Sequence, residues 1–194
     1  MEAIYEFDYA ILNFIQENLA TPFGDAFFSF ITHLADAGWF WIATAVVLLC
    51  FKKTRKVGLC MGIALVGGLL IGNITLKPLI ARIRPYDNLD YAPLRTAAEL
   101  LIEAPHDFSF PSGHTLASFE GAGAIFLCNK KWGVAALVLA ALIALSRLYL
   151  YVHYPTDIIA GILIALGLAY GAYKLVGFIE KKIAEKNAEK AENV

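Results

Sequence analysis

The chain has 194 residues, of which 59% are hydrophobic and 17% are charged, and its mean hydropathy is +0.61. Soluble domains are about 45–50% apolar and about 25% charged, so this composition argues against a soluble globule. A formal net charge of −1 and a pI near 6.4 exclude the basic surface of a nucleic-acid-binding protein. Because the length allows one domain, we expect a single membrane-embedded domain with no nucleic-acid partner.

The first 21 residues predict an amphipathic helix that lies on the membrane surface. Apolar residues recur at helical spacing between residues 4 and 19, but Glu6, Asp8 and Glu17 interrupt them. Such a mixture is typical of an interfacial helix and unsuitable for a spanning one. The acidic opening residues also differ from the positively charged start of a signal peptide. We therefore expect residues 1–21 to form an interfacial helix.

Five further stretches approach the roughly 20 apolar residues that a spanning helix needs. They are residues 38–51, 57–76, 114–128, 132–152 and 158–179. The first has only fourteen residues and must borrow apolar surface from residues 21–36. That upstream segment is then either a separate short span or an interfacial piece. We predict an all-α, polytopic membrane helical bundle with five or six transmembrane helices.

The sixteen Lys and Arg residues are divided unequally between the two faces of this bundle. They cluster between the first two predicted spans, between the third and fourth, and in the charged tail at 184–194. Cytoplasmic loops carry the excess of Lys and Arg, so these three places define the cytoplasmic side. We expect a multi-pass protein of the plasma membrane, with one domain at 1–183 and an external loop at 86–110 on the extracytoplasmic face.

Three motifs fall on that predicted extracytoplasmic face. They read Lys77-x6-Arg84-Pro85, Pro111-Ser112-Gly113-His114 and Ser146-Arg147-x5-His153-x3-Asp157. The three permanent cations can neutralise phosphate oxygens, and the backbone N–H groups after Ser112-Gly113, at a helix N-terminus, favour an anion. The Ser146 hydroxyl can bond either phosphate or a nearby backbone group. Together the motifs predict a phosphate-binding site.

The two histidines of these motifs can divide the steps of phosphoryl transfer. His153 and Asp157 are four residues apart, so the carboxylate can accept a hydrogen bond from Nδ1–H of the ring. That bond leaves the other ring nitrogen nucleophilic, and His114 can act as general acid and then as general base. Fixed cations can stabilise the developing charge, so we expect neither a metal nor a cofactor.

In order and composition, these motifs resemble the signature of the type 2 phosphatidic acid phosphatase superfamily of membrane lipid phosphatases. The resemblance implies a helical bundle that hydrolyses phosphate esters or diphosphates through a phosphohistidine, without a metal. It implies that His153 is the nucleophile, Asp157 its partner and His114 the acid. It also implies that the phosphate ligands are Lys77, Arg84, Ser112, Gly113 and Arg147, with Ser146 as a further member of the pattern.

The favoured substrate is a lipid whose phosphate lies at the headgroup level and whose tail lies in the bilayer. The resemblance and the small chain favour hydrolysis of undecaprenyl diphosphate to undecaprenyl phosphate and phosphate. Phosphatidylglycerophosphate or phosphatidic acid is the alternative substrate. A non-enzymatic transporter of phospholipids or anions would use the same cations, but it gives no reason for two histidines and an aspartate. Oligomeric state is left open.

Several residues outside the motifs carry weaker expectations. Arg82 is interpreted as a headgroup or surface contact, and His33 and His106 as structural or interfacial. Glu120 lies within a predicted span, where a carboxyl group is costly and marks a functional site, unless it pairs with a polar group or stays protonated. The 86–110 loop is long enough to be a lid or a binding segment, although a plain surface excursion is the alternative, and residues 94–102 predict a short amphipathic helix.

Overall fold

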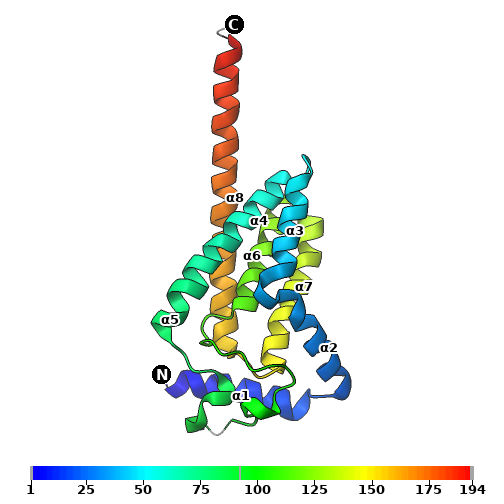
Figure 1. Cartoon of the computed structure of the whole chain (residues 1–194), viewed down its shortest axis with the longest axis vertical. Helices are drawn as coiled ribbons and strands as arrows, with labels where there is room; N and C mark the ends of the chain where they lie inside the picture. The colour runs from blue at the N-terminus through cyan, green and yellow to red at the C-terminus, as the bar shows by residue number, and fades with distance from the viewer. Residues whose placement is uncertain (1, 92, 193–194) are drawn as a thin grey trace.

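The computed structural model describes residues 2–91 and 93–192, and within these ranges every regular element is a helix or a helical turn. The helices are α1 (Glu2–Asn18), α2 (Pro22–Thr32), α3 (Trp39–Cys50), α4 (Arg55–Gly68), α5 (Lys77–Ile80), α6 (Gly113–Cys128), α7 (Lys130–Tyr149) and α8 (Pro155–Glu192). Figure 1 shows α3, α4, α6, α7 and α8 as a bundle, with α1 lying across one of its ends. The predicted all-helical class is confirmed.

Four helical segments of the described chain are long and apolar enough to cross a membrane. They are Pro22–Cys50, Arg55–Asp87, Lys130–Tyr149 and Pro155–Ala191. The shorter α6 has 16 residues and packs against α4, α7 and α8. Each predicted span corresponds to a helix, but α6, at the predicted span 114–128, is not among these four segments. The count of five or six crossings therefore stays a prediction.

The predicted span at 38–51 forms α3, and its upstream neighbour forms α2. The two are joined through a 3-10 segment, His33–Gly38, in which Ala37 and Gly38 have φ values of 49° and 69°. A kink therefore replaces the loop that would separate two independent helices. The upstream segment, for which two interpretations were open, is one arm of a single kinked apolar segment, Pro22–Cys50.

The second span is also irregular where it approaches the motif residues. α4 passes directly into a π-helical segment, Leu69–Leu76, and then into α5. π-Helical turns change the phase of the side chains that follow them and often occur at functional sites. Ala81 ends α5 in the left-handed region, with φ of 48°. The segment thereby turns away from the helix axis between Lys77 and Arg84.

Sequence signals account for the helix boundaries around α6 and α7. Ser112 is the N-cap of α6, and the Asn129 side chain caps α7 by accepting a hydrogen bond from the Trp132 N–H at 3.2 Å. α7 ends at Tyr149, so the expectation that its helix continues to Val152 is wrong. The chain turns there because Tyr151 has a φ of 61°, and this turn carries the residues that precede α8.

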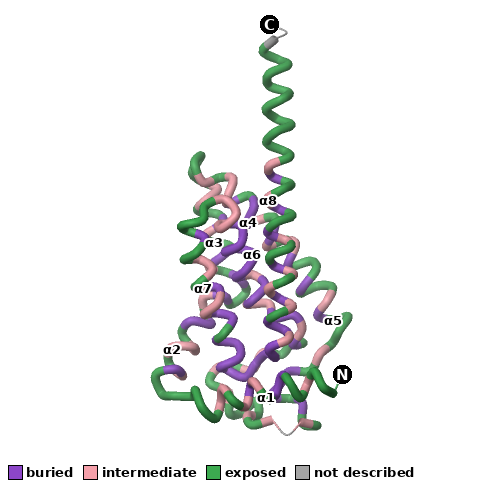
Figure 2. The backbone as a smooth tube through the Cα atoms, turned by 180° about the vertical axis from the view of Figure 1, so that it is seen from behind, coloured by how far each residue is buried: buried purple, intermediate pink, exposed green. Residues whose placement is uncertain are grey.

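Small residues allow α6 to lie at the centre of the bundle. A side chain at Gly121 would place Cβ 2.4 Å from the Trp41 ring, so only glycine lets α3 approach this closely. The Trp41 indole N–H donates to the Ser118 hydroxyl at 3.0 Å across the same contact. Buried residues gather inside the bundle, while the far half of α8 is exposed (Figure 2). Residues 184–192 of the charged tail continue α8 as a helix that projects beyond the bundle (Figure 1).

Candidate active site

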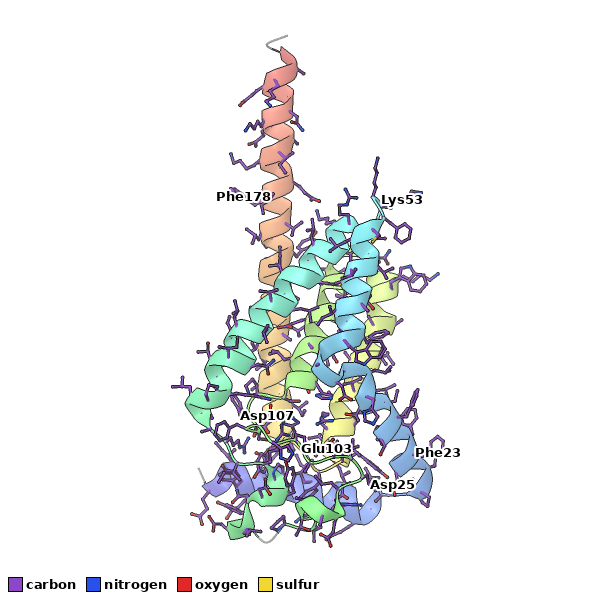
Figure 3. All side chains as sticks on the ribbon, in the orientation of Figure 1. Phe23, Asp25, Lys53, Glu103, Asp107 and Phe178 are labelled. Atoms are coloured by element: carbon purple, nitrogen blue, oxygen red, sulfur yellow. The ribbon has the colours of Figure 1, made fainter. Side chains whose placement is uncertain are left out.

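The fold gathers residues of all three motifs at one end of the bundle. Lys77 lies on α5, Ser112 precedes α6, Arg147 lies in the last turn of α7, and Asp157 lies in the first turn of α8. Figure 3 labels Asp107 at this end of the molecule and Lys53 at the opposite end. The motif end and the basic α3–α4 turn are therefore on opposite sides of the bundle, as the charge pattern predicts.

His153 is at the centre of the site and is 1% exposed. Its Nε2 lies 3.2 Å from Arg84 Nη1, and its Nδ1 faces Asp157 Oδ2 and Ser109 Oγ, each at 3.4 Å. Burial, followed by the positive charges of Arg84, Arg147 and Lys77, holds the pKa of His153 well below its usual range. The imidazole is therefore neutral at physiological pH, which is the protonation state of a nucleophile.

Asp157 is fully buried, and several donors share its carboxylate. Oδ2 accepts from the Tyr154 backbone N–H at 3.0 Å and from the Ser109 hydroxyl, and Oδ1 accepts from Arg82 Nη1 at 2.6 Å. The predicted contact with His153 is present, but at 3.4 Å it is the longest of these. Asp157 is thus held mainly by Ser109, Tyr154 and Arg82, of which none was among the predicted site residues.

Arg82 connects the site to α1, so the expectation of a surface or headgroup contact is wrong. Its side chain is 10% exposed, and Nη2 donates to Asp8 Oδ2 at 2.6 Å. Asp8, which is completely buried, also accepts from the Thr156 N–H at 3.0 Å and the Thr156 hydroxyl at 2.6 Å. The one signal of this contact in the sequence is Asp8, an acidic residue within the apolar pattern of the first helix. The prediction of an interfacial helix at residues 1–21 treats Asp8 as solvated.

Lys77 and Arg84 form the outer wall of the site, and both are largely buried. Arg84 Nη1 donates to the Val152 carbonyl at 2.6 Å, and its Nη2 donates to Asp107 Oδ1 at 2.5 Å. Lys77 Nζ donates to the other oxygen of the same carboxylate. Burial alone would raise the pKa of Asp107, but Lys77 and Arg84 outweigh it and lower the pKa to about 2. A carboxylate therefore bridges two cations of the predicted phosphate site.

Arg147 is the most deeply buried cation of the site. Its side chain is 2% exposed, its Nη1 donates to the Thr32 hydroxyl, and its Nε has no hydrogen-bond partner among the described residues. A buried guanidinium with an unused donor is costly unless an anion completes it. The unused donor therefore suits an anionic ligand beside Arg147.

The N-terminus of α6 supplies backbone donors beside Lys77. A Cβ on Gly113 would lie 3.9 Å from Lys77 Nζ, so the glycine brings the helix start close to this cation. The Ser112 hydroxyl caps the helix by accepting from the Thr115 backbone N–H at 3.5 Å, and it also accepts from the Thr115 hydroxyl at 3.0 Å. The Ser146 hydroxyl donates to the Ile143 carbonyl at 2.6 Å, which is the backbone alternative considered for it.

His114, in the first turn of α6, has a carboxylate partner that the motifs did not reveal. Its Nε2 lies 2.9 Å from Asp36 Oδ1, in the kink between α2 and α3. The side chain of His114 is 18% exposed, so one side of the ring remains open. Within residues 2–91 and 93–192, no group of three or more His, Cys, Asp and Glu side chains is arranged to hold a metal ion.

The external loop folds over the cations through Asp107. The prediction of a short amphipathic helix at 94–102 is wrong. Only the 3-10 turn Ala97–Glu99 forms there, with Thr96 and Glu99 as a capping box. The Tyr86 hydroxyl donates to the Pro105 carbonyl at 2.5 Å and closes the loop on itself. Of the alternatives considered, a segment that contacts the binding site fits this arrangement.

A groove runs from the site along α3 and α4. Its volume is about 620 Å³, and its polar end is lined by Lys77, Asp107 and His114. Apolar residues including Ile42 and Val66 line the rest, and Glu120 lies in its wall. Glu120 is 1% exposed, and its Oε1 has no hydrogen-bond partner among the described residues. Its carboxyl group packs against Gly68, where any side chain would collide with it.

These features define a class of protein, namely a helical membrane bundle with a buried histidine and three buried cations at one end. The model of the PAP2 superfamily matches residues 55–181, which include every predicted motif. The chain belongs to the PAP2 superfamily and is a multi-pass membrane protein. The resemblance seen in the motifs is therefore confirmed.

Characterised relatives and solved structures agree with this assignment. The chain is 34% identical over 131 residues to an undecaprenyl-diphosphatase of Sulfolobus acidocaldarius, an alignment that covers 67% of this chain and 60% of that protein. It is 32% identical over 165 residues to phosphatidylglycerophosphatase B of Bacillus subtilis, covering 78% of this chain and 73% of that protein. The crystal structure of Aquifex aeolicus LpxE superposes with a TM-score of 0.71 at 26% identity, covering 89% of this chain and 95% of that chain.

Proposed function

We propose that this protein is a metal-independent lipid phosphatase that works through a phosphohistidine intermediate. One observation carries the proposal: Arg84 lies 3.2 Å from Nε2 of the buried His153, and the buried cations Arg147 and Lys77 are near enough to help keep this ring neutral. Among the described residues, Asp107 is the one carboxylate that forms an ion pair with these cations, and it is half exposed. A phosphate group supplies the charge and the oxygens that such a cluster accommodates.

In the first step, His153 Nε2 attacks the phosphorus of the bound substrate. A proton on Nδ1 directed at Asp157 leaves Nε2 with its lone pair, and Nε2 is the nitrogen beside Arg84. The N–P bond forms while the P–O bond to the lipid breaks, and His114 donates a proton to the leaving oxygen. Lys77, Arg84 and Arg147 stabilise the charge that develops on the phosphoryl oxygens.

In the second step, water replaces the histidine. His114, now neutral, accepts a proton from the water molecule that attacks phosphorus. The N–P bond breaks, inorganic phosphate is released and His153 returns to its starting state. The burial of His153 limits access to this intermediate, so hydrolysis depends on the water that His114 activates.

The groove between α3 and α4 supports a lipid substrate. It begins beside Lys77 and His114 and continues as an apolar channel past Ile42 and Val66. A hydrocarbon chain placed there would leave its phosphate at the cations and would bury its tail against the two helices. A water-soluble phosphate ester without a hydrocarbon tail would leave this apolar groove unfilled.

Among lipid phosphates, we favour undecaprenyl diphosphate, hydrolysed to undecaprenyl phosphate and phosphate. Relatives with this named activity include the Sulfolobus acidocaldarius protein and BcrC of Bacillus subtilis, at 34% and 27% identity. Phosphatidylglycerophosphate or phosphatidic acid is the competing class, because the chain also aligns with phosphatidylglycerophosphatase B. We place the site on the extracytoplasmic face of the plasma membrane, because the basic turn at Lys53 lies at the opposite end.

The test is a phosphate-release panel with purified protein in detergent micelles. Prenyl diphosphate, phosphatidylglycerophosphate and phosphatidic acid are compared at equal surface concentration, with His153→Ala as the inactive control. We expect release to be fastest from the prenyl diphosphate and to be absent in the variant. Faster release from a glycerophospholipid would overturn the substrate assignment. Full activity in His153→Ala would overturn the mechanism, and lipid binding without release would favour a transporter.

A further inference from the structure

The kink between α2 and α3 brings a carboxylate to His114 from far away in the sequence. Asp36 Oδ1 lies 2.9 Å from His114 Nε2, and Asp36 Oδ2 lies 2.7 Å from His33 Nδ1. Asp36 therefore stands between the candidate general acid and an exposed histidine. None of the three motifs includes this residue.

The backbone around Asp36 departs from the helix in a costly way. Asp36 has a φ of −57° and a ψ of 124°, and Ala37 follows with a φ of 49°. Residues other than glycine seldom adopt positive φ, and such strain concentrates at functional sites. The Trp39 indole N–H donates to the His33 carbonyl at 2.8 Å and braces the turn.

The other strained positions of the described chain adjoin the active site. Apart from Ala37, the residues other than glycine with positive φ in that part are Ala81 and Tyr151. Ala81 lies between Lys77 and Arg84, and Tyr151 lies two residues before His153. The turn at Ala37 thus shares its positive φ with the two turns that carry the candidate phosphate ligands and the candidate nucleophile.

The same segment makes a second contact with the site. Thr32 lies four residues before Asp36 in the sequence, and its hydroxyl accepts a hydrogen bond from Arg147 Nη1. One short stretch at the end of α2 thus supports both a phosphate ligand and the candidate acid. Two independent contacts make an accidental approach of Asp36 a poor explanation.

We propose that Asp36 is the positioning residue of His114, as Asp157 is of His153. This inference rests on the proposed function. By accepting a hydrogen bond from Nε2–H, Asp36 fixes the ring and assigns proton transfer with the substrate to Nδ1. Burial and the nearby Arg147 lower the pKa of His114 to about 4, and the negative charge of Asp36 opposes this shift and favours the protonated ring. Asp36 itself does not touch the substrate.

The leaving group provides a readout that a structural role would not change. An alkyl phosphate releases an alkoxide, which needs a proton from His114, whereas nitrophenyl phosphate releases a stable phenolate that does not. We therefore compare kcat/KM, which reports the first chemical step, for dodecyl phosphate and for nitrophenyl phosphate in wild-type protein, Asp36→Asn, Asp36→Glu and His114→Gln. Asp25→Asn is the matched control, because it alters another hydrogen-bonded aspartate of the same apolar segment.

We expect Asp36→Asn to lower kcat/KM for dodecyl phosphate by about tenfold to a hundredfold, because this ratio reports the step in which His114 protonates the leaving oxygen. The loss for nitrophenyl phosphate should be several times smaller, His114→Gln should show the same selectivity, and Asp36→Glu should recover part of the lost rate. Equal losses on both substrates, or the same pattern in Asp25→Asn, would overturn the role of Asp36. Absence of phosphate release by the wild-type protein from these two substrates and from every lipid of the phosphate-release panel would instead overturn the proposed function, and this inference with it.

Discussion

Arg82 Nη1 lies 2.6 Å from Asp157 Oδ1, while Nη2 of the same guanidinium lies 2.6 Å from Asp8 Oδ2. One side chain therefore joins the first helix of the chain to the carboxylate behind the candidate nucleophile. Both aspartates are completely buried. The position of α1 across the end of the bundle is thus coupled directly to the candidate active site.

We expect Arg82→Ala to destabilise the protein by about 3–5 kcal/mol, the usual cost of leaving buried charges without their partner. The variant should also lose phosphatase activity, because Asp157 loses one of its donors. Thermal unfolding in detergent measures the first effect. Arg55→Ala, which removes an exposed cation on α4, is the control. Adding Asp8→Asn to Arg82→Ala should restore part of the stability; no recovery would contradict the charge explanation.

Asp107 occupies the space between Lys77 and Arg84 that a phosphate group would take. We expect Asp107→Asn to lower KM with little change in kcat, because the substrate no longer displaces a carboxylate. A half-exposed ion pair is worth up to about 1 kcal/mol, which corresponds to about fivefold in affinity. Asp90→Asn, an exposed aspartate of the same loop, is the control. A higher KM in Asp107→Asn would mean that the carboxylate holds the two cations in place for the substrate.

The depressed pKa of His153 makes a prediction about stability at low pH. In the unfolded chain, His153 becomes protonated near a pKa of about 6.5. In the folded protein its pKa is lower, so the ring stays neutral at that pH. The contribution of His153 to stability is therefore present above that pH and is lost as the pH falls below it. The unfolding midpoint should drop more steeply between about pH 7 and about pH 5 in wild-type protein than in His153→Gln. Parallel curves would contradict the assignment.

Phosphate release should continue in the presence of EDTA. Lys77, Arg84 and Arg147 are fixed cations at the candidate site, and they can stabilise charge that other phosphatases stabilise with metal ions. The measurement is the initial rate before and after prolonged dialysis against the chelator. A loss that added magnesium or zinc restores would show that the residues are insufficient by themselves.

Gly121 sets the distance between α3 and α6. A methyl group there would lie 2.4 Å from the Trp41 ring, so Gly121→Ala should destabilise the protein by about 1–3 kcal/mol. Gly167→Ala on α8 is the matched control, since nothing lies within 4 Å of the position that its methyl group would take. Unfolding midpoints of the two variants in detergent provide the comparison. Equal midpoints would show that α3 moves away freely.

The motif residues were recognisable from the sequence because their chemistry is local. Lys77 and Arg84 follow an apolar span, Ser112 and Gly113 start a helix, and His153 and Asp157 share a helical spacing. Charge, capping and periodicity are properties of neighbouring residues, and they persist whatever the rest of the chain does. The helical class and the opposition of the two faces follow from the same short-range rules.

The partners of these residues could be found only in the tertiary structure. Asp36 is separated from His114 by 78 residues, and Asp8 from Arg82 by 74, so no spacing rule connects them. A buried acid and a solvated acid look alike in sequence, because burial depends on what the rest of the chain places around it. Composition and local order thus determined a membrane bundle with a candidate phosphate site. Packing between distant segments decided which carboxylates lie beside His114 and Arg82.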